Sequence, residues 1–357
     1  GNNAFGDDAL SLNVTGTGLS AFGHRALQYS TGIQNTAMGA LAGDAITSGD
    51  FNTSLGYGSL SATTTADMNT AIGRTALQSN TTGANNTAVG GQAIQTNTTG
   101  ANNTAVGFGA LVQNTTANNN VAVGSSSLIA NTTGADNVSV GQGALQANTT
   151  AANNTSVGRD SLAANTTGAN NTALGKGAAE TNVDGDQNVI IGAAANTSAT
   201  DGNAANVLGY SVSGAAGYTT LGNTNDDIRA AHGNVTWATV SDERYKKDIV
   251  DSAAGLLFIN ALKPRTFKYK TLGELPETFN AYEADSTKVF KNSDTNHGFI
   301  AQEVKAAIDA DSSIKDGFRL WDDREDGSQE VAEAALIPVL VKAIQEQNAL
   351  IEALTTR

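Results

Sequence analysis

The chain has 357 residues, of which 39% are hydrophobic and 15% charged, with a formal net charge of −14 and no cysteine. The hydrophobic fraction is sufficient for buried cores, whereas the negative charge argues against a nucleic-acid partner, whose phosphates require a basic surface. The lack of cysteine excludes disulfides and thiolate metal sites, and three histidines far apart in sequence argue against a histidine-based metal centre. We expect no metal and no cofactor.

A change in composition divides the chain near residue 222. The part before it is built mainly from Gly, Ala, Asn and Thr and has no proline, whereas the part after it contains all three prolines and both tryptophans. No run of 18 apolar residues occurs, so we expect no membrane insertion. These observations predict a repetitive shaft over residues 1–209, a connector over 210–240 and a distinct domain over 241–357.

A repeat of 17 residues dominates the shaft. A glycine preceded by an apolar residue recurs thirteen times from Gly6 to Gly209, and each step is 17 residues except the step of 16 between Gly23 and Gly39. The residue directly before the glycine is of a usually buried type, so we predict that it points into a core. The residue before that one is Ala or Ser through Ala173. Such small side chains predict a close neighbour on their face, which could be another chain.

A second apolar position follows each glycine by four residues, as at Leu60 and Leu111, and it fails at Gly43, Ala179 and Asn196. Between these anchors lie Asn-Thr-Thr-Gly-Ala-Asn-Asn stretches, whose residues tolerate positive φ and hydrogen-bond their own backbone in turns. Each repeat therefore predicts a short strand, a tight corner, a second short strand and a polar turn.

Seventeen residues contain too few apolar groups to form a domain, so successive coils must stack and share one core. Proline is absent from the repeats because every amide in such a ladder donates to the next coil. The predicted fold is mostly β, with a parallel β-solenoid, or β-roll, as its shaft. Thirteen coils at the usual strand spacing of ~4.8 Å would make a rod roughly 60 Å long.

The Asn-Thr-Ala-Val-Gly units at residues 86–90 and 103–107 resemble the head repeats of trimeric autotransporter adhesins. In that family, three chains each wind a left-handed parallel β-roll about a common axis. The resemblance therefore implies a trimeric shaft, and a single-chain β-helix is the alternative.

The sequence of the connector and of the C-terminal domain predicts both strands and helices. In the connector, residues 218–222 are typical of one further strand and corner, and residues 234–240 alternate as in a half-buried strand. In the domain we predict a helix over 253–262, a strand over 265–270, a polar loop over 272–296, a strand leading into a helix over 297–304, and a long helix over 330–354. The domain is thus expected to be a small α+β fold.

The long helix carries a heptad seam, which predicts a coiled coil. Six residues follow 3-4-3-4-3 spacing, and Gln347 is the polar exception among them. Isoleucine at the three first-seam positions is compatible with a parallel trimer. The predicted trimer seam consists of Ile337, Leu340, Ile344, Gln347, Ile351 and Leu354.

The part of the chain from Ser241 onward resembles the C-terminal intramolecular chaperone of phage tailspikes and tail fibres, an endosialidase-type self-cleaving serine peptidase domain. Four blocks in order carry the resemblance: Ser241-Asp242-x-Arg244-x-Lys246-Lys247-Asp248-Ile249; Leu262-Lys263-Pro264 with Phe267-Lys268-Tyr269; Gly298-Phe299-Ile300-Ala301-Gln302-Glu303-Val304; and Leu336-Ile337-Pro338-Val339-Leu340-Val341-Lys342-Ala343-Ile344. In that family the domain trimerises, guides folding of the fibre ahead of it, and then cuts itself off directly before the serine.

The resemblance places the cleavage site between Val240 and Ser241. The Ser241 hydroxyl lies beside the scissile carbonyl by covalent necessity, and it becomes a nucleophile when a base takes its proton. The family's dyad position falls on Lys246, and a lysine can act as a base if burial lowers its pKa. Lys247 is its substitute.

Three further residues are candidates for a supporting role at this site. Asp242 and Arg244 could orient the dyad or stabilise the oxyanion. His297 could assist as well, although a histidine at a strand end is more often structural.

Together these features predict a homotrimeric tail fibre or appendage of a phage virion, with host attachment as its function. Its partners would be a host cell-surface receptor, either a glycan or a protein, and other tail proteins of the virion. Autoproteolysis would be a single-turnover event, with no activity on external substrates. The alternative is a bacterial cell-surface trimeric adhesin or filament that keeps its C-terminal cap. A glycan-cleaving solenoid enzyme is disfavoured because the 11 acidic residues of the shaft form no repeated or paired arrangement.

Overall fold

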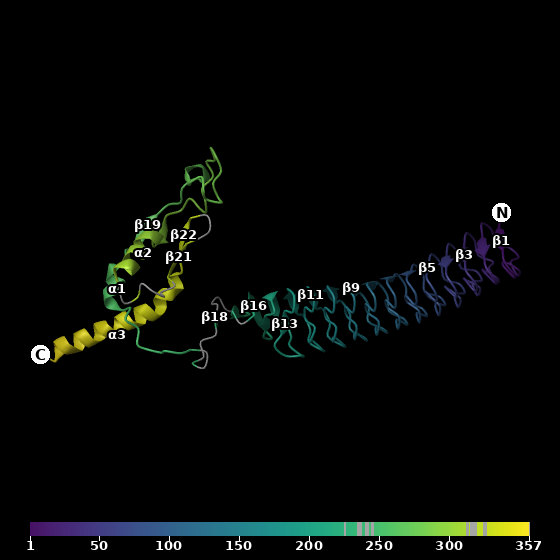
Figure 1. The fold of residues 1–357 in the computed structure, drawn as a ribbon, viewed down its shortest axis with the longest axis horizontal. Coiled ribbons are helices and arrows are strands. Elements are labelled where there is room, and N and C mark those ends of the chain that lie inside the picture. Colours follow the sequence, from purple (N-terminus) through teal and green to yellow (C-terminus); the bar gives the residue numbers. More distant parts are fainter. Residues whose placement is uncertain are drawn as a thin grey trace. The chain divides into compact units, whose positions relative to one another are not determined.

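The computed structural model describes residues 1–224, 226–233, 238–239, 243, 246–311, 314, 320–323 and 327–356. The chain divides into two compact units, Gly1–Ser241 and Asp242–Arg357. The first unit contains nearly all of the strands, and the second contains the helices (Figure 1). Among the described residues, no helix has the length and apolar character needed to cross a membrane.

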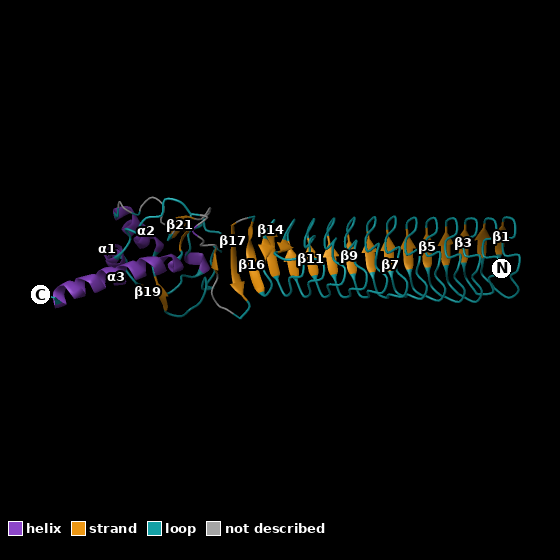
Figure 2. Ribbon diagram, turned by 90° about the horizontal axis from the view of Figure 1, so that it is seen from below, coloured by secondary structure: helices purple, strands orange, loops and turns teal. Residues whose placement is uncertain are grey.

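The first unit is a parallel β-solenoid, which confirms the predicted fold class. Each coil contributes one short strand to a continuous sheet, as the row of strands in Figure 2 shows. Neighbouring strands pair in parallel one repeat apart, so that Ala88 lies opposite Ala105. The strands of the repeat are β1 (Asn3–Phe5), β2 (Ser20–Phe22), β3 (Thr36–Met38), β4 (Thr53–Leu55), β5 (Thr70–Ile72), β6 (Thr87–Val89), β7 (Thr104–Val106), β8 (Val121–Val123), β9 (Val138–Val140), β10 (Thr155–Val157), β11 (Thr172–Leu174), β12 (Val189–Ile191) and β14 (Asn206–Tyr210).

The sheet continues past the repeat. Strand β16 (Tyr218–Asn223) pairs in parallel with β14 and sets Gly222 opposite Gly209, which confirms the strand predicted over 218–222. β17 (Asp226–Ala231) and β18 (Ala238–Thr239) then pair antiparallel and end the sheet. Of the strand predicted over 234–240, only β18 lies within the described residues. A small second sheet joins β13 (Asn196–Thr197) to β15 (Ser213–Gly214).

The core of the solenoid lies on the opposite side of each strand from the one predicted. In β7 the middle residue, Ala105, is fully buried, whereas Val106, which precedes the glycine, is 38% exposed. Phe5 at the equivalent position is 74% exposed. Successive residues of a strand point to opposite faces, so only one of these two columns can face the core. The narrow coil interior takes the small residue, so the prediction that the bulky residue is buried was wrong.

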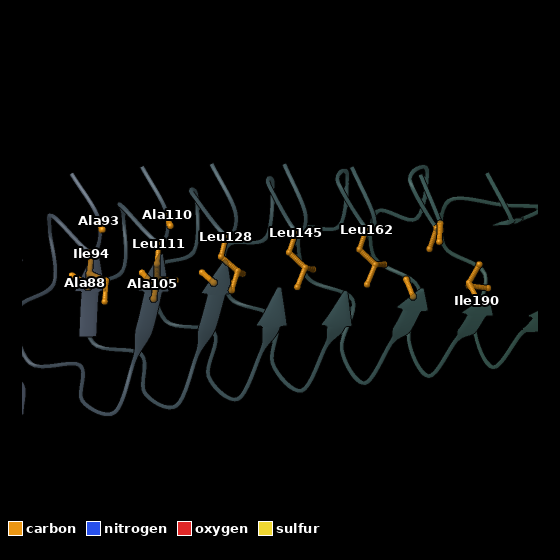
Figure 3. Packing of buried hydrophobic residues seen from close by; sticks show 14 of the residues in the cluster. Ala88, Ala93, Ile94, Ala105, Ala110, Leu111, Leu128, Leu145, Leu162 and Ile190 are labelled. Carbon is orange, nitrogen blue, oxygen red and sulfur yellow. The ribbon is translucent and has the colours of Figure 1, made fainter. Parts of the chain in front are cut away.

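The close neighbour of the Ala or Ser column is the chain's own second apolar column. Ile94, Leu111, Leu128, Leu145 and Leu162 are fully buried and follow one another along the axis of the solenoid, beside Ala88 and Ala105 (Figure 3). The prediction of this second column is therefore confirmed. Another chain does not approach the Ala or Ser column, because these residues are enclosed by their own coil.

Gly43, where the second apolar column fails, has a local compensation. A side chain at this position would begin 3.0 Å from Leu27 Cδ2 and 3.0 Å from Ile46 Cδ1. Ile46 lies seven residues after Gly39. The same position in a later repeat, seven residues after Gly90, is occupied by Asn97. This isoleucine is fully buried and contributes to the local cluster with Leu27. The missing leucine is thus replaced by an isoleucine from the following turn.

The recurring glycine is required by both conformation and space. Gly124 has φ of +133°, where L side chains are strained, and a Cβ there would lie 2.5 Å from the carbonyl oxygen of Gly141 in the next coil. The same close approach recurs at Gly107, whose Cβ would lie 2.6 Å from the Gly124 oxygen. Any side chain in this column would separate two coils.

Two columns of buried asparagines run inside the solenoid. The sequence pattern had predicted only turns at these asparagines. In the first column, Asn103 donates its backbone N–H to Asn86 Oδ1 at 3.0 Å and its side-chain amide to Ala117 O at 2.8 Å. In the second, Asn97 Nδ2 donates to Asn80 Oδ1 at 2.7 Å. The columns are Asn35, Asn52, Asn69, Asn86, Asn103, Asn120, Asn137, Asn154, Asn171 and Asn188, and Asn80, Asn97, Asn114, Asn131, Asn148, Asn165 and Asn182.

The second unit has a small α+β fold. Its antiparallel strand pairs are β19 (Arg265–Phe267) with β20 (Asn296–Gly298), and β21 (Trp321–Asp323) with β22 (Gln329–Val331). Helix α1 (Leu256–Ala261) packs on α3 (Leu336–Thr355), and both surround a core with α2 (Ala301–Ala310). Two 3₁₀ turns, η2 (Leu272–Glu274) and η3 (Glu333–Ala335), complete it. The long helix begins at Leu336 and not near residue 330, because Gln329–Val331 pairs as a strand.

Candidate functional site

The predicted cleavage site lies outside the described residues. Val240, Ser241, Asp242 and Arg244 all belong to this undescribed part. Lys246 is described, is exposed, and donates its backbone N–H to Glu243 O at 2.9 Å.

The segment after the junction is irregular and exposed. Lys246 and Lys247 are both exposed, and Asp248 has a positive φ of 55°. Ile249 is 62% exposed and Val250 is 85% exposed. Two lysines and two apolar residues therefore stand together on the surface of the second unit.

His297 lies on the pair of strands formed by β19 and β20. It is an exposed residue of β20, opposite Thr266 of β19, and its Nδ1 lies 3.3 Å from Thr266 Oγ1. It lines an open groove of about 1190 Å³, whereas Lys246 and Lys247 do not.

This groove lies in the described part of the second unit, and no sequence pattern predicted it. One side is aromatic: the ring of Phe267 meets that of Tyr269 edge-on at 5.4 Å, and Tyr269 meets Phe290 at 5.9 Å. Lys291 Nζ lies 5.3 Å from the Tyr269 ring centre, as in a cation–π contact. The β21–β22 side instead carries carboxylates, from Asp323, Glu330 and Glu333.

An ion pair joins the sheet beside this groove to helix α2. Arg265 Nε donates to Glu303 Oε2 at 2.8 Å, and a second guanidinium nitrogen contacts Oε1. The hydrogen bonds and charge of Arg265 lower the pKa of Glu303 and the carboxylate raises that of Arg265. At η2, hydrogen bonds from Thr271 lower the pKa of Glu274. Both carboxylates are therefore held in the charged form.

Helix α3 has one buried face and one exposed face. Leu336, Val339 and Ala343 are buried against the core of the unit. All six residues of the predicted seam lie on the exposed part of the helix, with Ile337 at 62% and Leu354 at 72% exposure. The seam is apolar but has no partner within the described part of one chain.

The solenoid carries a second apolar surface. We define the outer sheet face as the first and third residues of strands β1 to β12, with Asn206 and Leu208 of β14. This face contains Thr, Val, Leu, Ile, Phe, Met, Asn and Ser and no charged residue. It extends along all thirteen of these strands, so it is too long to be a random exposed patch.

Among the described residues, one group of side chains has the spacing of metal ligands. Ligand atoms of Asp7, Asp8 and His24 lie within 4.8 Å of one another, but all three residues are exposed. Exposed acidic groups commonly lie this close without an ion, so we assign no metal to them.

Comparison with known proteins concerns the junction and the first half of the second unit. Residues 241–311 match the family model described as the chaperone of endosialidase. This segment contains α1, β19, β20 and α2, together with both lysines of the junction. No curated protein and no solved structure matched the chain. A β-solenoid followed by an intramolecular chaperone domain of this type fits a fibre-like protein.

Proposed function

We propose that three copies of this chain assemble into a fibre or appendage, with the second unit as the chaperone that drives trimerisation. The exposed seam of α3 carries this proposal, because six residues at heptad spacing face away from the core of their own unit. A parallel three-stranded coiled coil would bury this seam. The match to the chaperone of endosialidase supports the same role.

The outer sheet face supports the proposal from the shaft. Its side chains repeat once per coil, so the surface with the matching spacing is the same face of another copy. Such rods can pair out of register at little cost, because a slip of one coil preserves nearly every contact. A domain without repeats, which trimerises first, would set the register.

Self-cleavage between Val240 and Ser241 belongs to this proposal. Lys246, or Lys247 in its place, would take the Ser241 proton, and the hydroxyl oxygen would attack the Val240 carbonyl carbon. The peptide C–N bond then breaks to give an ester and a free amine on Ser241, and water hydrolyses the ester. Loss of the chaperone would make assembly kinetically irreversible.

Asp242 and Arg244 would orient the dyad or bind the oxyanion. His297 lines the groove, and the lysines of the junction do not. It would therefore contribute to cleavage only if assembly brings His297 of one chain to the junction of another.

The role of such a fibre would be host attachment. On a virion tail, the shaft would reach a glycan or protein receptor on the host surface, and other tail proteins would hold it. The adhesin-like units at 86–90 and 103–107 favour, as a second candidate, a trimeric adhesin on a bacterial surface. Immunogold labelling of virions and of cells would distinguish the two locations.

Light scattering during gel filtration tests the trimer. In a Ser241→Ala background, which keeps the chain intact, we expect the mass of three chains of 36.2 kDa each, and a monomer when Ile344→Asp and Ile351→Asp are added. Asn348→Asp, an exposed change on the same helix outside the seam, is the control and should remain trimeric. A monomeric wild type would overturn the architecture.

Denaturing mass analysis of freshly made protein tests cleavage. We expect a fragment beginning at Ser241 that disappears in Ser241→Ala and in Lys246→Ala. Only intact chains in the wild type would refute self-cleavage and leave the trimer standing.

A further inference from the structure

Residues 263–303 form a part of the second unit without a core of its own. None of these 41 side chains is fully buried, although six of them are aromatic: Phe267, Tyr269, Phe279, Tyr282, Phe290 and Phe299. Phe290 is 42% exposed and the other five are only partly buried, so each leaves some apolar surface in contact with water. A cover from another segment would remove this remaining surface from water.

The groove is the place where that cover is missing. Four of the ten phenylalanines of the chain line it, namely Phe267, Phe279, Phe290 and Phe299. Three carboxylates from β21, β22 and η3 line it as well, and Lys291 is the lysine that lines it. The occupant that fits is an extended segment with apolar side chains and an excess of positive charge.

The chain contains such a segment at residues 246–250. Its sequence, Lys-Lys-Asp-Ile-Val, places two positive charges and one negative charge before two apolar residues. Ile249 and Val250 are among the most exposed apolar residues of the second unit. In its own unit the segment lies outside the groove, because none of its residues lines it.

We infer that this groove binds residues 246–250 of a neighbouring copy of the chain. Lys247 would pair with Glu333 and Asp323, and Ile249 and Val250 would cover the aromatic rings. The inference rests on the proposed trimer.

The seam of α3 begins close in sequence to one lining residue of the groove. Glu333 lines the groove, and Ile337, the first seam residue, follows it by four positions through η3. A copy that packs on the first turn of the seam therefore comes within reach of the groove. The trimer would then exchange its junction segments between chains, and each junction would lie beside the His297 of a neighbour.

Cysteine crosslinking tests this exchange, and the chain has no native cysteine to interfere. In a Ser241→Ala background, which keeps the chain intact, we would co-express one chain with Lys247→Cys and another with Glu333→Cys. Mild oxidation should join the two chains into a covalent dimer. Lys247→Cys with Asp309→Cys, an exposed residue of α2 that does not line the groove, is the matched control.

The outcomes separate the inference from the proposed function. Trimers by light scattering without crosslinking above the control overturn the inference and leave the trimer intact. A crosslink within one chain of the Lys247→Cys, Glu333→Cys double variant also overturns it. A monomeric wild type overturns both.

A charge exchange provides a second test that needs no disulfide. Glu333→Lys and Lys247→Glu should each weaken trimer association about tenfold, and the two together should restore it. Additive losses in the double variant would contradict a direct pairing.

Discussion

Leu256, the first residue of α1, donates its backbone N–H to Glu346 Oε2 of α3 at 2.8 Å, across 90 positions of sequence. The carboxylate thereby satisfies an amide that α1 cannot satisfy itself. It also packs against Gly255, where a Cβ would lie 2.5 Å from Oε2. One acidic residue of the long helix thus fixes the start of the short one.

We expect Glu346→Ala to lower the free energy of unfolding of the second unit by about 2 kcal/mol, the usual size of a hydrogen bond to a charged group. Urea unfolding followed by Trp321 fluorescence in a Trp237→Phe background would measure it. Glu346→Gln retains an oxygen acceptor and should lose less. Equal losses for both variants would show that the charge, not the acceptor, stabilises this contact.

The glycine column predicts a large difference between two glycines of the shaft. Gly124→Ala forces a side chain against the Gly141 carbonyl at φ of +133° and should cost at least about 3 kcal/mol. Gly91→Ala is the control, since its Cβ would meet only the Phe108 ring, at 3.5 Å, and should change little. Thermal unfolding followed by circular dichroism compares them, and similar midpoints would contradict the steric argument.

Substitution of two adjacent asparagines should affect stability very differently. Asn103→Ala leaves the buried Asn120 N–H without its side-chain acceptor, at a cost of about 1–3 kcal/mol, while the Ala117 carbonyl keeps the hydrogen bond that Asn114 Nδ2 donates. Asn102 is exposed with φ of 58°, so Asn102→Gly should be almost neutral. Denaturant midpoints of the two variants measure the difference.

Gly43 and Ile46 should behave as a coupled pair. Gly43→Leu alone should clash with Leu27 and Ile46, and Ile46→Asn alone should leave a cavity beside Gly43. The double variant restores the pattern of the other coils and should be more stable than the sum of the single changes indicates, by roughly 1–3 kcal/mol. A double-mutant cycle from thermal unfolding tests this, and additivity would refute the compensation.

The Arg265–Glu303 pair predicts an acid-sensitive contribution to stability. Arg265 holds the pKa of Glu303 below its usual value of 4.5, so the stabilisation is present above that pH and is lost as the pH falls through the folded-state pKa. Glu303→Gln should therefore be less stable than the wild type at pH 7 and should approach it in acid. Urea titrations at a series of pH values would show whether the two curves converge.

The sequence predicted the solenoid well because its period, 17 residues, and its glycine column are independent of which face is buried. The prediction that Val106 points into the core was wrong, because Val106 is exposed and the neighbouring Ala105 is buried. Apolar character alone does not distinguish a residue in the core from one on an exposed sheet face. The width of the coil distinguishes them, because the interior beside the leucine column has room only for Ala or Ser.

The asparagine columns and the groove were missed for different reasons. Asn85 and Asn86 are both residues typical of turns, yet only Asn86 is buried. The signal was present within the repeats, where Asn recurs at 103, 120 and 137, whereas the position before it changes to Asp136. The groove joins residues from three separate segments, which no local pattern connects. Of the candidate dyad, only Lys246 falls within the described residues.

The second asparagine column ends at Asn182, whose Oδ1 is buried and lacks a hydrogen-bond partner among the described residues. Residue 199, one coil further, is alanine. Coils between Asn80 and Asn182 are thus clamped by side chains as well as by backbone, whereas the last coils depend more on backbone alone. The coils before Asn80 lack this column as well, since residues 30, 46 and 63 are Ser, Ile and Thr, so under a pulling force the middle of the shaft should be the last part to open.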